Sequence, residues 1–330
     1  MVLNAECLKD TMNQVYNSCE SRLTTPNGKT AVFCVIGDPV SHSMSPQIHR
    51  RFADICKINM AYVPFHVKND NIPAMLTGAH AMGIRGINVT VPHKMAVMPH
   101  LFEIDAMAQK VGTVNTLVWT EEGYVGYNTD YIGIQRTIAA QGMTFANQSV
   151  AIIGAGGSAY AAAVAAADGD AKKISVINRT EKNALVLASH INKHYNVPIQ
   201  VDDVESVRFA DIVIQTTTVG FGNLSDKSPL PDSSSSSDIS SSSDKPLASN
   251  EKLLNNIKLA FDIIYTPSET VFMQQAKEAG VPKIVNGLPM LIYQAAESFE
   301  IWRKSFFVDS DSESIPNEEI ENIIKWLHSN

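Results

Sequence analysis

Two ionisable side chains, Lys94 and Asp130, occur in short polar stretches whose composition suits a hydroxylated small molecule. Lys94 ends the segment Asn88-Val89-Thr90-Val91-Pro92-His93-Lys94, in which an alternating strand stops at a proline that cannot continue the pairing. Asp130 ends the segment Gly126-Tyr127-Asn128-Thr129-Asp130. Each residue alone is typical of a strand end or a turn. Together they form a cation and an anion with neighbouring amide groups, which is a set suited to a polyhydroxylated ring.

Further polar side chains occur in loops that follow apolar, strand-like runs. Ser43 and Ser45 lie in the loop after the run Ala31 to Ile36, and we interpret both as ligand hydroxyls, although Ser45 could instead cap the following helix. Thr90 shares the strand end of the first polar stretch, and Asn115 lies in a later turn that leads into a strand. Because the carboxyl ends of parallel strands meet at one edge of a sheet, we expect these groups to lie together.

A glycine-rich stretch after the apolar run Ser149 to Ile153 predicts a dinucleotide site. Gly154-Ala155-Gly156-Gly157-Ser158-Ala159 has the Gly-x-Gly-x-x-Ala pattern, in which backbone N–H groups and a helix N-terminus face a pyrophosphate. The next strand, Ile174 to Ile177, ends in Asn178-Arg179-Thr180, and no acidic residue is present there to hold the ribose 2′-hydroxyl of NAD. Since the guanidinium of Arg179 presents fixed donors to a 2′-phosphate, we expect NADP to be preferred to NAD.

A polar pocket together with a dinucleotide site indicates hydride transfer, which gives the lysine and aspartate a chemical role. Reduction of a ketone leaves negative charge on oxygen in the transition state, and a positioned ammonium stabilises that charge and can supply the proton. A carboxylate within hydrogen-bonding reach would orient the ammonium. We therefore expect Lys94 and Asp130 to be the catalytic pair. The sequence does not decide which of them is the formal base, because a coupled pair titrates as a unit.

Strands and helices alternate along the chain, which predicts an α/β fold with two α/β domains flanking a cleft. The first domain, residues 1–131, is expected to contain a mainly parallel sheet and the substrate site, and the helices of residues 288–330 are expected to return to it. The second domain, residues 132–287, is expected to be a Rossmann-type domain that binds NADP. Within it, the serine-rich stretch 229–250 is expected to be a disordered loop.

Apolar periodicity predicts the individual elements of both domains. The expected strands cover 31–36, 61–66, 86–91, 149–153, 174–177, 212–215, 259–264 and 283–285. The expected helices cover 47–56, 71–82, 131–142, the alanine-rich run to 167, 274–280 and a long helix from 288. The first 29 residues are expected to form a helix laid on the core. Ile320, Ile323, Ile324 and Leu327 recur at helical spacing, so the C-terminal tail is expected to dock.

Composition excludes several classes of protein. Of the 330 residues, 45% are hydrophobic and 18% are charged, and the net charge is −8, so a polyanion such as nucleic acid is an unfavourable partner. No apolar stretch is long enough to span a membrane, and the N-terminus does not have the pattern of a signal peptide. The four cysteines, Cys7, Cys19, Cys34 and Cys56, have no metal-ligand spacing. We expect reduced thiols, no metal and a cytoplasmic protein.

In their order and spacing, these motifs resemble the shikimate dehydrogenase family, whose members reduce 3-dehydroshikimate to shikimate with NADPH. The resemblance covers Ala31 to Trp302 and includes the motifs above, Val114-Asn115-Thr116 and the stretch Gly287 to Gln294. It implies an NADP-dependent oxidoreductase of the shikimate pathway, which leads to chorismate and the aromatic amino acids. It also implies a small-molecule substrate and a monomer or homodimer.

The same resemblance implies the ligand residues. The substrate would be held by Ser43, Ser45, Thr90, Lys94, Asn115, Asp130 and Gln294, with Tyr265 close by. The cofactor would be held by the loop Gly154 to Ala159 and by Asn178, Arg179, Thr180, Thr217, Ile263 and Gly287. Family members often have a second basic group where this chain has Asn183, and Lys182 is the candidate to replace it. Gln294 can reach the substrate only if the helix from Leu288 returns to the first domain.

Two other functions remain open. A quinate or dual quinate/shikimate dehydrogenase shares the fold, but members that favour quinate tend to have threonine at the second loop serine and an acidic group near the adenosine ribose. Ser45 and Arg179 argue against that interpretation. A non-catalytic ligand-sensing protein on the same fold would be expected to lose Lys94 or Asp130, and both are present.

Overall fold

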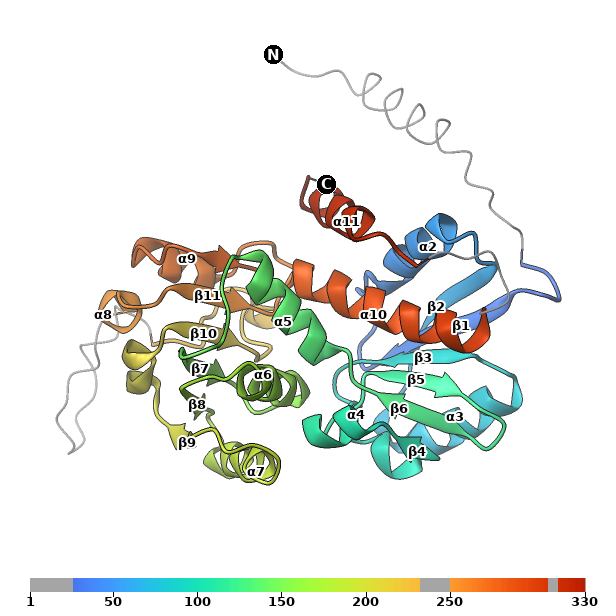
Figure 1. Ribbon diagram of the computed structural model, residues 1–330, viewed down its shortest axis with the longest axis horizontal. Helices are drawn as coiled ribbons and strands as arrows, with labels where there is room; N and C mark the ends of the chain where they lie inside the picture. The colour runs from blue at the N-terminus through green and yellow to red at the C-terminus, as the bar shows by residue number, and fades with distance from the viewer. Residues whose placement is uncertain (1–25, 232–249, 308–313, 330) are drawn as a thin grey trace, which may run out of the picture.

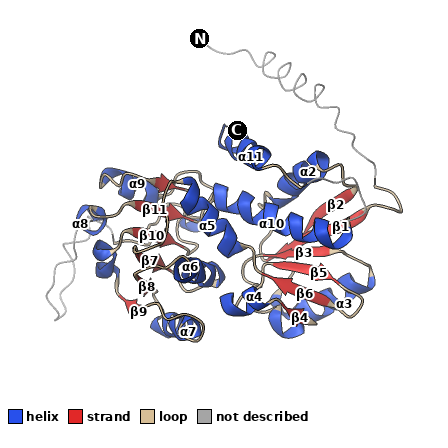
Figure 2. Ribbon diagram, in the orientation of Figure 1, coloured by secondary structure: helices blue, strands red, loops and turns tan. Residues whose placement is uncertain are grey.

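The computed structural model of the chain describes residues 26–231, 250–307 and 314–329. The expected N-terminal helix and most of the serine-rich stretch therefore lie outside the described residues. The described chain forms two six-stranded sheets with helices on both faces of each (Figures 1 and 2). This is the predicted α/β class with two parallel-rich sheets.

The first sheet has the strand order β2-β1-β3-β5-β6-β4. The strands are β1 (Ala31–Gly37), β2 (Met60–His66), β3 (Gly86–Val89), β4 (Glu103–Ile104), β5 (Thr116–Trp119) and β6 (Tyr124–Tyr127). β2, β1 and β3 are parallel, whereas β5 is antiparallel to both β3 and β6. β5 and β6 form a hairpin around Glu121-Glu122-Gly123, so the sheet is mixed rather than wholly parallel.

Helices cover both faces of the first sheet because β1 is apolar on both sides. Phe33 packs among residues of α2 (Ser45–Ile55) and α10 (Leu288–Phe306), whereas Cys34 and Ile36 pack against α3 (Ile72–Ala81) and α4 (Ala106–Val111). These three β1 residues are at most 1% exposed. The carboxyl end of β1 is thereby held between two helical layers.

The second sheet is parallel throughout, in the order β12-β11-β10-β7-β8-β9. The strands are β7 (Ser149–Ile153), β8 (Lys173–Ile177), β9 (Ile199–Asp202), β10 (Ile212–Gln215), β11 (Leu259–Asp262) and β12 (Ile284–Val285). One face is covered by α5 (Asp130–Ala140), α6 (Gly157–Asp168) and α7 (Glu181–Ile191), and the other by α8 (Asn250–Leu254) and α9 (Val271–Glu278). Alternate residues of β7 fill the two cores, as expected for a central strand.

α10 connects the two sheets (Figure 1). It starts directly after β12 of the second sheet, and near its other end Trp302 is 1% exposed and donates from Nε1 to the carbonyl of Leu117 in β5 at 2.9 Å. α11 (Asn317–Ser329) places Ile320, Ile323 and Ile324 in the same core cluster as Trp302. The expected docking of the tail is confirmed.

Several element boundaries differ from the expectations for identifiable reasons. The strand expected over 86–91 ends at Val89, because its regular pairing with β5 stops at Asn88 and that with β1 at Val89; Thr90 and Val91 keep only single backbone bonds to Ile36 and Asp38. The helix expected from 274 begins at Val271, where Thr270 accepts from the N–H of Met273. α7 and β9 were not expected from the sequence, and β9 is a short, partly exposed edge strand with weak patterning.

Candidate active site

The polar residues named from the sequence converge on a cavity of about 190 Å³ between the carboxyl ends of β1 and β3, the start of α5 and the first turns of α10. All eight residues expected to hold the substrate line it, namely Ser43, Ser45, Thr90, Lys94, Asn115, Asp130, Tyr265 and Gln294. Of the residues expected to hold the cofactor, Ser158, Ile263 and Gly287 also line it. Residues from the parts of the chain that form each of the two sheets therefore line the cavity together.

Lys94 and Asp130 form a buried ion pair in this cavity. The Nζ atom of Lys94 donates to Oδ2 of Asp130 at 2.6 Å, and the two side chains are 11% and 5% exposed. Asp130 is the first residue of α5, where the N-terminal end of the helix dipole favours a negative charge. Its neighbour Asn128 accepts from the N–H of Asp130 at 3.0 Å and donates to Thr113, so the turn before the helix is held in place. The protein itself therefore fixes the geometry of the pair.

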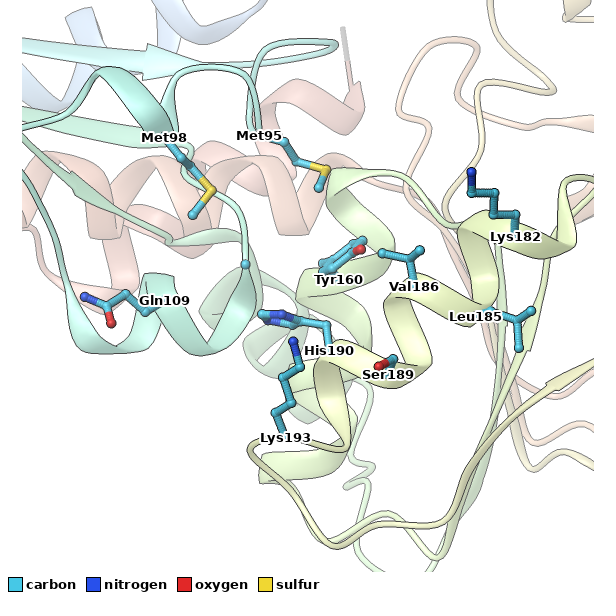
Figure 3. Close-up of a pocket in the computed structure, with 11 residues that line it drawn as sticks. Met95, Met98, Gln109, Tyr160, Lys182, Leu185, Val186, Ser189, His190 and Lys193 are labelled. Atoms are coloured by element: carbon cyan, nitrogen blue, oxygen red, sulfur yellow. The ribbon is translucent and has the colours of Figure 1, made fainter.

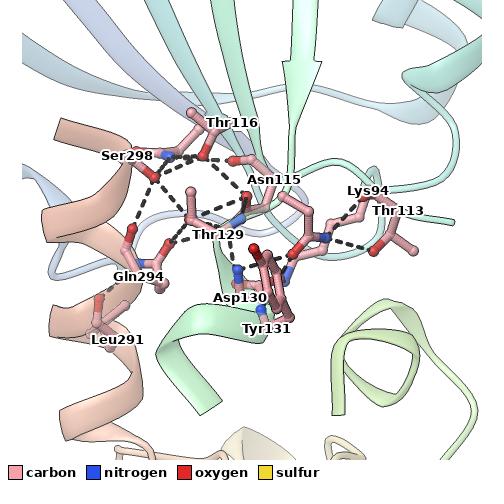
Figure 4. Close-up of polar contacts among 12 residues, drawn as sticks. Lys94, Thr113, Asn115, Thr116, Thr129, Asp130, Tyr131, Leu291, Gln294 and Ser298 are labelled. Carbon is pink, nitrogen blue, oxygen red and sulfur yellow. Dashed lines mark hydrogen bonds and ion pairs between the residues drawn. The ribbon is translucent and has the colours of Figure 1, made fainter. Parts of the chain in front are cut away.

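Asn115 lies beside the ion pair with its amide orientation set by the backbone (Figure 4). Its Oδ1 accepts from the N–H of Thr129 at 2.8 Å, so its Nδ2 faces Oδ1 of Asp130 at 2.9 Å. The same nitrogen lies 3.2 Å from Oε1 of Gln294, which joins the first sheet to α10. Asp130 thus accepts from a lysine on one oxygen and from an amide on the other.

Asn88 lines the cavity as well, although the sequence did not assign it a role. It is 7% exposed, its Oδ1 accepts from the hydroxyl of Tyr62 at 2.7 Å, and its Nδ2 donates to the carbonyl of Asn115 at 3.2 Å. The available signal was its position two residues before Thr90, on the same face of the strand.

The two loop serines and Tyr265 complete the rim of the cavity. Ser43 accepts from the N–H of Ser45 at 3.3 Å, and no side chain caps α2, so the alternative that Ser45 caps this helix is wrong. Burial raises the pKa of Tyr265 above its ordinary value of 10.0. Its hydroxyl therefore stays protonated at neutral pH and is available as a donor.

The glycine-rich loop brings the start of α6 next to Lys94. Gly154 has a φ of +120°, which only glycine adopts readily, and a Cβ added there would meet Thr216 and Thr217. At Gly156 a Cβ would meet nothing within 4 Å, so the backbone is open to an approaching ligand. A Cβ at Gly157 would lie 3.2 Å from Cδ of Lys94. An open, glycine-lined helix N-terminus beside the ion pair fits a dinucleotide whose reactive end faces the cavity.

The residues after β8 fit the adenosine end of such a cofactor. Asn178 donates to the carbonyl of Thr180 at 2.8 Å and shapes the turn. Arg179 is exposed, and no carboxylate among residues 26–231, 250–307 and 314–329 forms an ion pair with it. A guanidinium without a competing carboxylate is available to a 2′-phosphate.

Two other predicted cofactor positions are explained by their backbone surroundings. Thr217 is half-buried, and its hydroxyl accepts from the N–H of Val219 at 3.1 Å, which closes the turn after β10. A side chain at Gly287 would collide with the backbone of Ile263, so only glycine allows the start of α10 to approach the end of β11. Gly287 therefore lines the cavity, whereas Thr217 shapes the turn after β10 without lining it.

Lys182, on the first turn of α7, lines a larger hollow of about 630 Å³ between α7 and the loop after β3 (Figure 3). The hollow is mostly apolar, with Met95, Leu185 and Val186 each about half exposed. None of the residues expected to hold the substrate lines it. It contains no paired acid and base, so the smaller cavity is the one equipped for chemistry.

The described residues provide no alternative reactive centre. Among them, no group of three or more histidine, cysteine, aspartate or glutamate side chains could hold a metal ion. Cys34 and Cys56 are free and buried, and burial raises the pKa of Cys34 to about 12, which keeps it a thiol. Cys7 and Cys19 lie outside the described residues. Within the same ranges, no helix is long and apolar enough to cross a membrane.

Three family models match successive parts of the chain. They are the shikimate dehydrogenase substrate binding domain over residues 35–117, shikimate / quinate 5-dehydrogenase over residues 137–223 and the shikimate 5′-dehydrogenase C-terminal domain over residues 287–304. The shikimate dehydrogenase (NADP(+)) of Methanococcus aeolicus is 34% identical over 280 residues, which are 84% of this chain and 93% of that protein.

Solved structures agree over nearly the whole chain. Shikimate 5-dehydrogenase from Listeria monocytogenes, in complex with shikimate and NAD, has a TM-score of 0.75 at 27% identity and covers 91% of this chain and 98% of its own. Shikimate 5-dehydrogenase from Thermus thermophilus, in complex with NADP(H) and shikimate, has a TM-score of 0.74 at 28% identity and covers 90% of this chain and 99% of its own.

Proposed function

This chain belongs to the shikimate dehydrogenase family, and from that membership we propose that it catalyses the reversible, NADPH-dependent reduction of 3-dehydroshikimate to shikimate. The reaction is a step of the shikimate pathway, which leads to chorismate and the aromatic amino acids. The observation that carries the proposal is the 2.6 Å contact between Lys94 and Asp130, inside a cavity that borders the glycine-rich loop.

Lys94 performs the proton chemistry of the reduction. Bound NADPH supplies a hydride to the carbonyl carbon, and the carbonyl oxygen gains negative charge. The ammonium of Lys94 stabilises that charge and passes a proton to the oxygen, which completes the alcohol. In the oxidative direction, Lys94 and Asp130 accept the hydroxyl proton as a coupled pair.

Asp130 has a positioning and a binding role. It holds the ammonium through one carboxylate oxygen and leaves the other beside Asn115, where it can accept from a ring hydroxyl. Ser43, Ser45, Thr90, Asn115, Tyr265 and Gln294 supply the remaining donors and acceptors for the ring and its carboxylate. Residues 1–131, with the helices of 288–330, hold the substrate in this scheme, and residues 132–287 hold the cofactor.

NADP is the cofactor of the reaction. The start of α6 and its open glycines face the pyrophosphate, while Arg179 binds the 2′-phosphate, with Asn178, Thr180 and Lys182 around it. The Methanococcus aeolicus relative is named as NADP-dependent, whereas the Listeria monocytogenes structure contains NAD. The strength of the preference therefore depends on the exposed residues after β8.

One experiment separates the candidate functions. Purified protein is assayed with shikimate and with quinate, each against NADP and against NAD, and shikimate binding is followed in parallel by calorimetry. Shikimate with NADP is expected to give the highest kcat/KM. A higher kcat/KM with quinate would instead identify a quinate-type enzyme. Binding of shikimate without turnover under any of the four conditions would identify a non-catalytic sensor.

A further inference from the structure

We propose that Ser298, a buried hydroxyl on α10, is a positioning residue for shikimate recognition that acts through Thr116 on the amide of Asn115. This inference rests on the proposed function, because Asn115 is one of the groups assigned to the substrate. Ser298 itself does not line the cavity, and neither does Thr116. It is therefore not a catalytic or ligand residue.

Ser298 lies at the centre of a buried polar cluster behind the substrate cavity (Figure 4). Its side chain is 0% exposed, as are those of Thr116 and Thr129. The Oγ atom of Ser298 is 2.7 Å from Oγ1 of Thr116 and 3.0 Å from Oγ1 of Thr129. The Nδ2 atom of Asn88 approaches it at 3.2 Å. Ser298 thus joins α10 to two segments of the first sheet's carboxyl edge.

Proton counts and distances together assign the direction of each hydrogen bond. Asn115 presents its Oδ1 to the N–H of Thr129, so its Nδ2 must be a donor, and it lies 2.9 Å from Oγ1 of Thr129. Thr116 donates to Oδ1 of Asn115 at 3.0 Å. Each hydroxyl has only one proton to give. Ser298 has two acceptors for its proton, Oγ1 of Thr116 at 2.7 Å and the carbonyl of Gln294 at 3.0 Å, and we assign the proton to the shorter contact. The Thr129 hydroxyl likewise donates to Ser298 at 3.0 Å, its shortest contact with an acceptor.

These assignments close a ring of four hydrogen bonds that all run in the same direction. Ser298 donates to Thr116, Thr116 to Asn115, Asn115 to Thr129 and Thr129 to Ser298. Bonds in such a ring polarise and strengthen one another in a buried environment. The ring uses one N–H of Asn115 and leaves the other for Oδ1 of Asp130. The amide is thereby held in the orientation that the substrate site needs.

Removal of the Ser298 hydroxyl would open the ring at two points. Thr116 would lose its donor and Thr129 its acceptor, and both hydroxyls are fully buried, away from solvent that could replace the partner. Loss of a buried partner of this kind typically changes an equilibrium by about tenfold or more. The Ser298 hydroxyl also lies 3.0 Å from the backbone carbonyl of Gln294, whose side chain contacts Asn115, so the substitution would remove a second polar contact beside the site. The effect should fall on the substrate and not on the cofactor.

The test compares Ser298→Ala with two matched controls. Ser305→Ala removes a hydroxyl from the same helix that bonds the carbonyl four residues earlier, and Thr137→Val removes a buried hydroxyl that bonds Gly133. We expect kcat/KM for shikimate to fall about tenfold in Ser298→Ala, with the KM for NADP within about twofold of the parent. Neither control should change kcat/KM for shikimate. An unchanged kcat/KM in Ser298→Ala, or an equal rise in the KM for NADP, would overturn the proposal.

A double-mutant cycle tests whether the hydroxyl acts through Asn115. In an Asn115→Ala background, Ser298→Ala is expected to cost less than about twofold in kcat/KM for shikimate, because the group it positions is gone. An equal cost in both backgrounds would show that Ser298 acts by another route and would contradict the proposal. If Ser298→Ala does not fold, Thr116→Val breaks the same ring with nearly the same shape, and the same cycle is measured with it.

The parent protein in these assays keeps the two proposals apart. If the parent does not oxidise shikimate, the proposed function is wrong, and the ring is then tested by the affinity for shikimate in calorimetry. If the parent oxidises shikimate and Ser298→Ala and Thr116→Val both match it, only the role of the ring is wrong.

Discussion

On the substrate side of the cleft, Lys94, Asn115 and Asp130 are buried and bond to one another, whereas on the cofactor side Arg179 and Lys182 are exposed. The substrate side is built from side chains on three different segments, and hydrogen bonds within the protein hold them in place. The cofactor side offers an open backbone at Gly156 and exposed cationic side chains at its rim.

This difference follows from what each ligand brings to its site. A small hydroxylated ring has little apolar area, so its orientation must come from a few donors and acceptors held in advance. A dinucleotide carries its own charges and a large surface, so a helix N-terminus and one or two cations are enough to hold it. Substitutions on the substrate side should therefore change kcat, and those on the cofactor side should change the KM for NADP.

The largest expected effect is at Lys94. Lys94→Ala should lower kcat by a factor of about 10² to 10⁴, with a smaller change in the KM for shikimate, because it removes both charge stabilisation and the proton donor. Asp130→Asn should lower kcat similarly without unfolding the protein. Steady-state kinetics at saturating substrate measure both. Turnover of Lys94→Ala within a few-fold of the parent would show that the lysine only binds.

Asp262 is an exception on the cofactor side, because it is a buried carboxylate. It is 0% exposed at the end of β11 and accepts from Thr270 at 2.6 Å and from the N–H of Ile264 at 3.0 Å. Burial raises its pKa from 3.8 to about 6. Between these values the folded protein holds a proton that the unfolded chain has lost, so its contribution to stability falls as pH rises from about 4 to 6.

Asp262→Asn should remove this loss of stability, because its amide oxygen can still accept from the N–H of Ile264 and its NH2 can donate to the hydroxyl of Thr270. Relative to the parent, the variant should gain on the order of 2 kcal/mol of unfolding free energy as the pH rises through that window. Thermal unfolding measured from pH 4 to pH 7 gives the difference. Parallel stability curves for the two proteins would mean that Asp262 is not protonated in the folded state near pH 5.

Substitution of Arg179 should change cofactor binding without changing kcat. Arg179→Ala should raise the KM for NADP by about tenfold and leave the KM for NAD and kcat nearly unchanged, because only NADP carries the 2′-phosphate. Lys172→Ala, an exposed lysine that precedes β8 at the end away from Arg179, is the matched control for loss of an exposed positive charge. Equal losses with both cofactors would contradict the 2′-phosphate role and would weaken the contrast between the two sides.

Gly157 belongs to the glycine-rich loop of the cofactor side and lies against Lys94 of the substrate side. Its substitution should have the smallest kinetic effect. A Cβ there would lie 3.2 Å from Cδ and 3.3 Å from Cβ of Lys94, which is tight enough to displace the lysine slightly. Gly157→Ala should therefore lower kcat by roughly three- to tenfold. Gly156→Ala should instead raise the KM for NADP, because that position is open to the cofactor. If both variants changed the same kinetic constant, the division between a substrate side that controls kcat and a cofactor side that controls the KM for NADP would be wrong.

Local sequence patterns were sufficient for much of this architecture. Apolar runs and glycine or proline stops placed β1, β7 and β10 closely, because a strand buried on both faces has a continuous apolar signature. The fingerprint at Gly154 marked the start of α6, since backbone conformation and close packing restrict the residues there. The polar loops and the family motifs named eight substrate residues that all line the cavity, and their individual roles remain predictions.

Only the tertiary structure decided how those residues contact one another. Ser298 meets Thr116 across 182 positions of the chain, and Asn88 became part of the site through bonds to Tyr62 and Asn115. The antiparallel pairing of β5 with β3 and the edge strand β9 likewise had no distinct local signal. Spacing along the chain fixes which way a side chain points from its own strand or helix. The partners that it meets depend on how α10 crosses between the two sheets, and that is set by the packing of the whole molecule.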